Sequence, residues 1–299
     1  MILLLRALGV GDLATAVPAL RGLRRAFPGQ HIQLAAPGWL APLVELTGAV
    51  DELLPVAGLD GCIRWPSPSP QLAVNLHGRG PESHWLLHTA DPKQLFGFAC
   101  QAAGYHLGPV WRADEHEVAR WCRMLRWYGI ATDPTDLALA VPEGPTGLAG
   151  VTIVHPGAKL PERRWPASRY GEVARALAAA GHRVVVTGSD EEQERAARVA
   201  AAAGLPDSAV LAGRTDLRQL AGLVARARLV VSGDTGIGHL ASAYGTPSVL
   251  LFGPTPPEQW GPPDRPVHRV LWRGPTGLGQ ITVPEVVTAA EEVVGLARG

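Results

Sequence analysis

Residues 229–254, LVVSGDTGIGHLASAYGTPSVLLFGP, constrain the fold of this chain more than any other stretch. An apolar run rich in β-branched residues (229–231) predicts a buried strand, and a glycine-rich break (232–236) follows it. A short helical pattern then leads to a second apolar run at 248–252. This order of strand, turn, helix and strand is suited to anions, because backbone N–H groups converge at the helix N-terminus, where the helix dipole favours negative charge. The stretch therefore predicts a phosphate site within an α/β fold.

Asp234 lies inside this turn and narrows the kind of ligand. A carboxylate accepts hydrogen bonds from hydroxyls but repels a bare phosphate, so we expect a ligand that carries sugar beside its phosphates. On this interpretation Asp234 binds ribose or sugar hydroxyls, while Thr235 and Gly236 offer N–H groups to the phosphates. His239, one helical turn later, is either a phosphate contact or a packed helix residue.

The rest of the chain alternates strand and helix patterns in two series, which predicts parallel sheets covered by helices. A stretch rich in proline and glycine, residues 133–148, separates the series and is typical of an interdomain linker. We therefore predict two Rossmann-like domains, residues 1–145 and 146–299, that face each other across a cleft in the GT-B arrangement. The last helix (284–297) could pack back on the first domain.

Composition excludes several classes of protein. The 27 basic and 27 acidic residues balance, which argues against nucleic acid as the main partner. No run of about 18 apolar residues predicts a membrane span, and the first residues lack the pattern of a signal peptide, so we expect a cytoplasmic protein. The three cysteines, Cys62, Cys100 and Cys122, are widely spaced, which predicts reduced, mostly buried thiols and no metal site.

Three stretches resemble glycosyltransferase family 9, the ADP-heptose:lipopolysaccharide heptosyltransferase group. The pattern DTGxxHLAxAxxxPxxxLFGPT (234–255) resembles the C-terminal signature of that family, and GVGDLATAVPALRGLRRAFP (9–28) resembles its N-terminal motif. HPGA and RRWP (155–166) resemble its HPGA and KRWP segment. Together the resemblance covers nearly the whole chain. It implies an inverting glycosyltransferase with the GT-B fold that moves heptose from ADP-heptose to an acceptor hydroxyl.

Asp12 follows the first predicted strand at the start of a helix. Its residue type there fits an ordinary N-cap. The resemblance implies a further role, that of a general base which takes the proton of the acceptor hydroxyl as this hydroxyl attacks the anomeric carbon. Gly11 is then a neighbouring acceptor contact. The lone GxG of residues 9–11 does not predict NAD binding, because no acidic residue ends the next strand.

Arg163 follows another predicted strand, where its charge can neutralise a departing diphosphate, although a solvated basic pair with Arg164 is the plain alternative. The resemblance implies that Arg163 takes the place of a lysine that contacts the donor phosphates, and it adds Gly157 and Ala158 to the donor site. An arginine at that position differs from the family pattern, because its charge is a planar fork rather than a point.

The stretch 187–192 ends a strand and begins a helix. Ser189 and Glu192 have the spacing of a capping box. The resemblance implies that acidic residues here face the donor ribose, which makes Asp190 or Glu191 a donor contact.

Arg79 and His84 follow a strand of the first domain and are the predicted acceptor contacts. We expect the acceptor to be a glycan, a glycolipid or a small molecule, and peripheral contact with a membrane is compatible with the sequence. No acidic motif is placed to hold a cation on a diphosphate, so we predict a reaction without metal or other cofactor.

Two other classes of function remain open at this level. A sugar-nucleotide 2-epimerase of the same architecture needs no acceptor but needs several acid–base groups, and Asp12 alone is well placed. A non-catalytic nucleotide-sugar-binding protein would need neither Asp12 nor a basic donor site.

Overall fold

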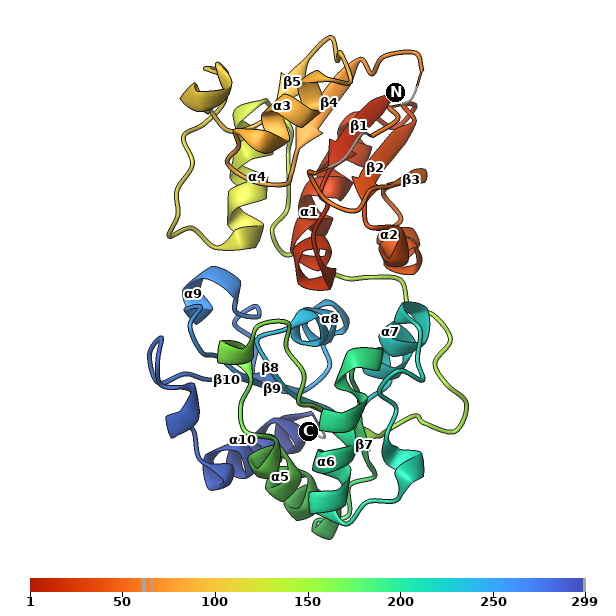
Figure 1. Ribbon diagram of the computed structural model, residues 1–299, viewed down its shortest axis with the longest axis vertical. Coiled ribbons are helices and arrows are strands. Elements are labelled where there is room, and N and C mark those ends of the chain that lie inside the picture. Colours follow the sequence, from red (N-terminus) through yellow and green to blue (C-terminus); the bar gives the residue numbers. More distant parts are fainter. Residues whose placement is uncertain (61–62, 66, 298–299) are drawn as a thin grey trace. The chain divides into compact units, whose positions relative to one another are not determined.

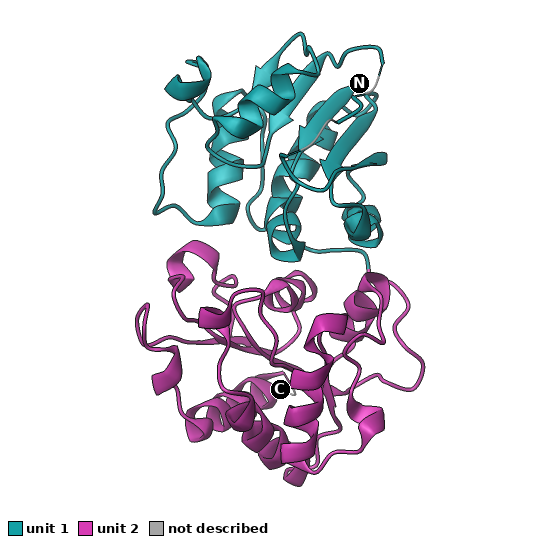
Figure 2. Cartoon of the chain, in the orientation of Figure 1, with its two compact units in different colours: residues 1–140 teal, residues 141–299 magenta. Residues whose placement is uncertain are grey.

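A computed structural model describes residues 1–60, 63–65 and 67–297 (Figure 1). The chain divides into two compact units, residues 1–140 and 141–299 (Figure 2). The division falls inside the stretch rich in proline and glycine. Of the three cysteines, Cys122 is buried and Cys100 half-buried, both as free thiols, while Cys62 lies outside the described residues.

The first unit holds a parallel sheet in the order β3-β2-β1-β4-β5. Its strands are β1 (Ile2–Leu5), β2 (Ile32–Ala36), β3 (Glu52–Pro55), β4 (Leu72–Asn75) and β5 (Leu95–Phe96). Its helices are α1 (Val10–Ala26), α2 (Ala41–Thr47), α3 (Glu82–His88) and α4 (Glu117–Trp127). Because side chains alternate along a strand, Leu3 and Leu5 share one face of β1, where they join a core with Leu87 of α3. Helix α1 packs against α2 and α4.

The second unit repeats this design with a parallel sheet in the order β10-β9-β8-β6-β7. Its strands are β6 (Thr152–His155), β7 (Val184–Val186), β8 (Leu229–Gly233), β9 (Ser248–Leu251) and β10 (His268–Leu271). Its helices are α5 (Ala167–Ala179), α6 (Gln193–Ala203), α7 (Leu217–Ala225), α8 (Gly236–Tyr244), α9 (Pro257–Trp260) and α10 (Val283–Leu296). Helices α5, α6 and α10 share one hydrophobic core with the sheet, whereas α7 packs against α8.

Helix α10, for which the sequence allowed a place on the first domain, packs in the second unit against α5, β9 and β10. Val286, Ala290 and Val293 carry this contact, because they lie fully buried in the core of that unit.

Each sheet reverses its winding beside its first strand, and this reversal positions the sites. In the first unit the chain winds outward from β1 to β3 and returns to β4 on the other side of β1. In the second unit it leaves β6 for β7 and returns to β8 on the other side of β6. Ligands of open parallel sheets bind at the carboxyl ends of the strands at such a reversal. We therefore expect ligands to bind at the loops after β1, β4, β6 and β8.

The elements differ from the sequence-based expectation in three places. The apolar residues 209–211 predict a short strand, but Asp207–Ala209 form a 3₁₀ turn and Val210 makes a single bridge to Val186. The helical spacing of apolar residues begins at Leu13 and predicts a helix from there, but α1 already starts at Val10. Strands β5 and β10 were not predicted, because β5 has two residues and the half-exposed edge strand β10 mixes His268 and Arg269 with apolar residues.

Candidate functional site

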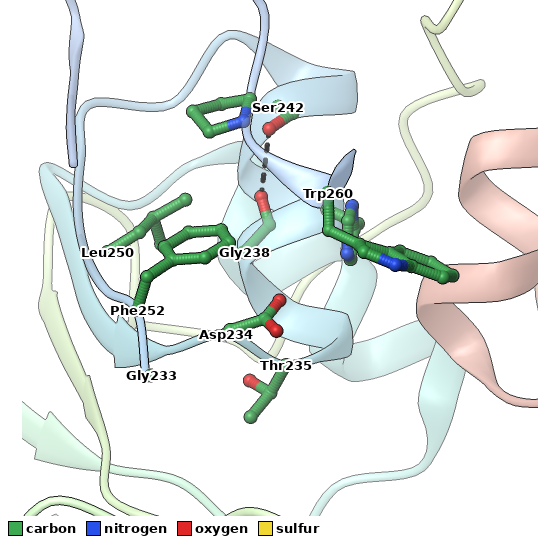
Figure 3. A pocket seen from close by; sticks show the side chains of 10 residues that line it. Gly233, Asp234, Thr235, Gly238, Ser242, Leu250, Phe252 and Trp260 are labelled. Carbon is green, nitrogen blue, oxygen red and sulfur yellow. Dashed lines mark hydrogen bonds between the residues drawn. The ribbon is translucent and has the colours of Figure 1, made fainter. Parts of the chain in front are cut away.

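The carboxyl end of β8 and the first turns of α8 line a pocket in the second unit (Figure 3). The lining residues are Gly233, Asp234, Thr235, Gly238, His239, Ser242, Leu250, Phe252, Trp260 and Pro262. Gly238 lies where α8 crosses β9, and a Cβ there would crowd Leu250. A small residue at this position therefore keeps the helix close to its sheet.

Asp234 is the ionisable group at the centre of this pocket. Its side chain is 7% exposed, and the carboxylate lies 3.6 Å from a guanidinium nitrogen of Arg163, whose side chain is 36% exposed. Burial raises the pKa of Asp234 to about 6, although the charge of Arg163 acts in the opposite direction. Arg163 also donates a 2.9 Å hydrogen bond to the hydroxyl of Thr255. The structure therefore brings Asp234 and Arg163 together, although 70 residues of sequence separate them.

The first turn of α8 presents donors beside Asp234. Thr235 is the N-cap and Gly236 the first helical residue, so the N–H groups that open the helix are not used in its own ladder. The Thr235 hydroxyl is buried and finds no hydrogen-bond partner in the part of the chain that the structure describes. His239 is half-buried, and its ring packs edge-on against Trp260 with 5.8 Å between the ring centres. The packing role predicted as one alternative for His239 is therefore present in the structure.

The loop after β6 completes this side of the unit. Gly157 and Ala158 are buried, and a Cβ on Gly157 would overlap the carboxylate of Glu192. Glu192 accepts a 2.9 Å hydrogen bond from the N–H of Ser189, so the predicted capping box is confirmed. His155, whose Nδ1 lies 3.0 Å from the Thr187 hydroxyl, has its pKa lowered by burial, while Glu192 acts against that shift.

Glu192 is thus the acidic side chain that reaches the loop after β6. Asp190 and Glu191 are exposed, and Asp190 accepts a 3.0 Å hydrogen bond from Gln193. The sequence pattern predicts only a capping role for Glu192. Its place after β7, the strand that pairs with β6, brings its carboxylate to the loop after β6.

In the first unit, Asp12 occupies the third position of α1. Its Oδ2 accepts a 3.1 Å hydrogen bond from the N–H of Gly9, which is the N-cap. The N-cap role considered for Asp12 is therefore wrong, because Val10 and Gly11 are already helical. The Asp12 side chain remains 28% exposed and can meet a ligand.

Arg6 lies directly behind Asp12 and was missed by the sequence-based reasoning. Its side chain is 1% exposed, and one guanidinium nitrogen lies 3.6 Å from Oδ1 of Asp12. It also donates to the carbonyls of Asp12 and Leu76 and, over 3.0 Å, to Glu117 of α4. A charged residue at the end of the apolar run ILLLR was the available signal, because a buried arginine requires partners.

The loop after β4 contributes His77 beside this group. The N–H of Ala7 donates to Nδ1 of His77 over 3.2 Å. Burial and the charge of Arg6 lower the pKa of His77, and the charge of Asp12 raises it. Because Nδ1 accepts from Ala7, the neutral form of the His77 ring carries its proton on Nε2.

Arg79 and His84, two of the three predicted acceptor contacts, differ in exposure. Arg79 is exposed after β4. His84 is 0% exposed and belongs to the core, where its Nε2 lies 3.0 Å from the Phe98 carbonyl and its Nδ1 lies 3.1 Å from the Asn75 amide. Burial lowers the pKa of His84. The acceptor contact predicted for His84 is wrong, because the side chain satisfies its hydrogen bonds inside the unit.

Comparison with known proteins identifies the kind of chain to which these sites belong. Residues 131–273 match the model of glycosyltransferase family 9 (heptosyltransferase). Lipopolysaccharide heptosyltransferase 2 of Salmonella typhimurium is 27% identical over 287 residues, covering 83% of this chain and 81% of that protein. Lipopolysaccharide heptosyltransferase 1 of Pseudomonas aeruginosa is 36% identical over 205 residues, covering 68% of this chain and 49% of that protein.

Solved structures share the fold. A family 9 glycosyltransferase from Veillonella parvula matches with a TM-score of 0.80 at 22% identity, covering 99% of this chain and 97% of that chain. The E. coli ADP-heptose lipopolysaccharide heptosyltransferase II matches with a TM-score of 0.79 at 22% identity, covering 100% and 99%. The predicted α/β fold class with two Rossmann-like domains is confirmed.

The fold and its matches define a glycosyltransferase with the GT-B fold. The matched residues and the named relatives place the chain in glycosyltransferase family 9, as its motifs predicted.

Proposed function

We propose that this glycosyltransferase moves heptose from ADP-heptose to a hydroxyl of a lipopolysaccharide acceptor, with inversion at the anomeric carbon. The named relatives act as lipopolysaccharide heptosyltransferases, and a solved structure of the E. coli heptosyltransferase WaaC contains ADP. The observation that carries the proposal is the pocket at the end of β8, where Asp234, the Thr235 hydroxyl and the first N–H groups of α8 offer partners to a sugar diphosphate.

On the donor side, positive groups meet the diphosphate and acidic groups meet hydroxyls. Arg163 and the amides at Thr235 and Gly236 stabilise the charge that develops on the departing diphosphate. Asp234 accepts hydrogen bonds from sugar hydroxyls, which offset the unfavourable burial of its carboxylate. Glu192 accepts from the ribose, because its carboxylate reaches the loop after β6.

On the acceptor side, Asp12 removes the proton of the attacking hydroxyl. Its partial exposure allows a hydroxyl to approach, and the Gly9 N–H and Arg6 fix its orientation. A positioned general base contributes about 10²–10⁴-fold to such a rate. Exposed Arg79 is a candidate contact for anionic groups of the acceptor.

The reaction is proposed to need no metal ion, because Arg163 and the α8 N-terminus supply positive charge where a cation would otherwise sit. The test is transfer in buffer with excess chelator, followed by addition of Mg²⁺. Unchanged rates are expected. A rate that falls with chelator and returns with Mg²⁺ would contradict metal independence.

Acceptor binding and location remain linked proposals. Among the described residues, none of the helices is long and apolar enough to cross a membrane. We propose a cytoplasmic protein that meets a glycolipid acceptor at the membrane surface. Fractionation of cells that express the full chain, at low and high salt, tests this location. We expect the protein in the cytoplasmic fraction and partly on membranes at low salt. High salt should release the membrane-bound part.

The first experiment is calorimetric titration with ADP, GDP, UDP and dTDP at one salt concentration. We expect a preference for ADP and then transfer of heptose, detected by mass spectrometry, to lipopolysaccharide that lacks core heptose. Preference for another nucleotide would exclude ADP-heptose as the donor. Conversion of the donor sugar to its 2-epimer without acceptor would favour the sugar-nucleotide 2-epimerase class instead.

A further inference from the structure

The ionic cluster formed by Arg6, Glu117 and Arg120 lies buried behind Asp12. Glu117 is the shared partner, because its carboxylate accepts from Arg6 over 3.0 Å, from the Trp121 indole over 2.8 Å and from Arg120. The two arginines lower the pKa of Glu117, against the effect of its burial. A buried ion pair costs much of its attraction in desolvation, so stability alone is a weak reason for three buried charges here.

Arg6 connects this cluster with the two loops at the reversal of the first sheet. It donates to the backbone carbonyl of Asp12 after β1 and to that of Leu76 after β4, and its charge lies 3.6 Å from the Asp12 carboxylate. Its guanidinium also lies 4.9 Å from the centre of the Trp121 ring. The planar fork of one arginine can satisfy several acceptors in fixed directions, which a more mobile side chain cannot do.

We propose that Arg6 is a positioning residue for Asp12, and that Glu117 of α4 fixes Arg6 in that role. This inference rests on the proposed function of Asp12 as the base. Arg6 does not reach the acceptor, because it is buried; it acts by holding the Asp12 carboxylate and the β4 loop in one arrangement. A displacement of about 1 Å at a reacting group can cost about 100-fold in rate.

Arg120 provides a matched control within the same cluster. It shares Glu117 with Arg6 and is also buried, but it donates to the carbonyls of Arg112, Ala113 and Glu115 and lies 4.3 Å from the Trp111 ring centre. Loss of Arg120 therefore disturbs the fold of the first unit without removing the group that holds Asp12.

The experiment compares Arg6→Met, Arg6→Lys and Arg120→Met by thermal unfolding, ADP titration and heptose transfer at saturating donor and acceptor. We expect Arg6→Met to lower kcat about 100-fold while ADP affinity is unchanged, because the donor binds in the other unit. Arg6→Lys should have a kcat about tenfold higher than that of Arg6→Met. Arg120→Met should lower the unfolding temperature to a similar extent and keep kcat within about threefold.

Combination with Asp12→Asn separates this inference from the proposed function. If Arg6 acts through Asp12, Arg6→Met should lower the residual activity of Asp12→Asn by less than about threefold. Equal losses of kcat in Arg6→Met and Arg120→Met would overturn the inference, and so would a full 100-fold loss in the Asp12→Asn background. Should Arg6→Met fail to fold, the same comparisons are made with Arg6→Lys and Arg120→Lys. Near-normal transfer by Asp12→Asn alone would overturn the base itself and the inference with it.

Discussion

Two carboxylates, Asp12 and Asp234, each follow a strand that flanks the reversal of its sheet, Asp12 after β1 and Asp234 after β8, yet their surroundings are opposite. Asp12 is 28% exposed and its cation Arg6 is 1% exposed. Asp234 is 7% exposed and its cation Arg163 is 36% exposed. In the first unit the carboxylate is the more exposed member of the ion pair, and in the second unit it is the cation. The two charges are 3.6 Å apart in both units.

The difference separates a fixed group from one that responds to a ligand. A buried cation tied to carbonyls cannot move, so Arg6 holds Asp12 in one position. Under the proposed function, the partly exposed Arg163 turns towards the diphosphate of the donor, and the desolvated Asp234 gains from a donor hydroxyl that donates to it. The comparison predicts that changes at Asp12 affect the rate and that changes at Asp234 affect binding and stability.

Asp12→Asn should have the largest effect, a fall in kcat of about 10²–10⁴-fold, because an amide cannot take the proton of the acceptor. ADP affinity should stay unchanged. Steady-state transfer kinetics and calorimetry of the same preparation check both statements. A variant that loses ADP affinity together with kcat would break the distinction between the two carboxylates.

Asp234→Asn should change how stability depends on pH. The pKa of Asp234 is about 6 in the folded protein, against 3.8 ordinarily, so the folded state binds the proton more tightly than the unfolded state. The stability due to this group is therefore fully present below pH 4 and is lost as the pH rises through 6, a loss of about 3 kcal/mol. The variant should gain stability over the native chain by that amount between pH 4 and pH 7, while it binds the donor sugar less tightly.

Urea unfolding at a series of pH values measures this difference. Asp190→Asn is the control, because Asp190 is an exposed aspartate of the same unit. A parallel course of the native and Asp234→Asn curves across pH 4–7 would show that the Asp234 carboxyl does not titrate in this range.

Arg163→Ala should raise the Kd for ADP about tenfold, which corresponds to one charge-assisted contact with phosphate. Arg163→Lys should keep most of the affinity, since the charge remains. Arg164→Ala is the matched control and should change Kd by less than about threefold, because Arg164 donates to the carbonyl of Ala158. Adenosine, which lacks phosphates, should bind all these variants equally. Equal Kd changes in the two alanine variants would instead assign both arginines to one diffuse basic patch.

Ser189→Ala should have the smallest effect, a loss of up to about 1 kcal/mol in stability with unchanged ADP affinity, as expected for a helix cap. Glu192→Ala should cost a similar stability and should also raise the Kd for ADP. Unfolding measurements and calorimetry on the two variants decide whether Glu192 acts only as a cap. Equal ADP affinities of Ser189→Ala and Glu192→Ala would indicate that it does.

The sequence predicted most elements to within a few residues because its apolar periods are regular. It also predicted a phosphate site at the turn after β8, where the structure has a pocket, because the glycine turn is local. Asp234, Thr235 and Gly236 stand next to one another in the chain, so their shared place at a helix N-terminus needed no tertiary information. The sequence pattern did not predict strand β5 and wrongly predicted a strand at 209–211. A strand of two or three residues depends on its neighbours in the sheet rather than on its own pattern.

Burial and long-range pairing could only come from the tertiary structure. The place of His84 after a strand predicted an acceptor contact. Only its hydrogen-bonded contacts with Asn75 and Phe98 show that it belongs to the core. Glu117 lies 111 residues from Arg6 in the sequence, so no local pattern predicts that they pair.

The sequence by itself determined the two α/β series, the glycine turn and the family motifs, since these depend on residues close together in the chain. The tertiary structure alone decided which charges are buried and which partners they meet. The free energy of an ionised group depends on solvent and on neighbours brought from distant segments, and for that reason Asp12 and Asp234 look alike in the sequence and differ in the folded chain.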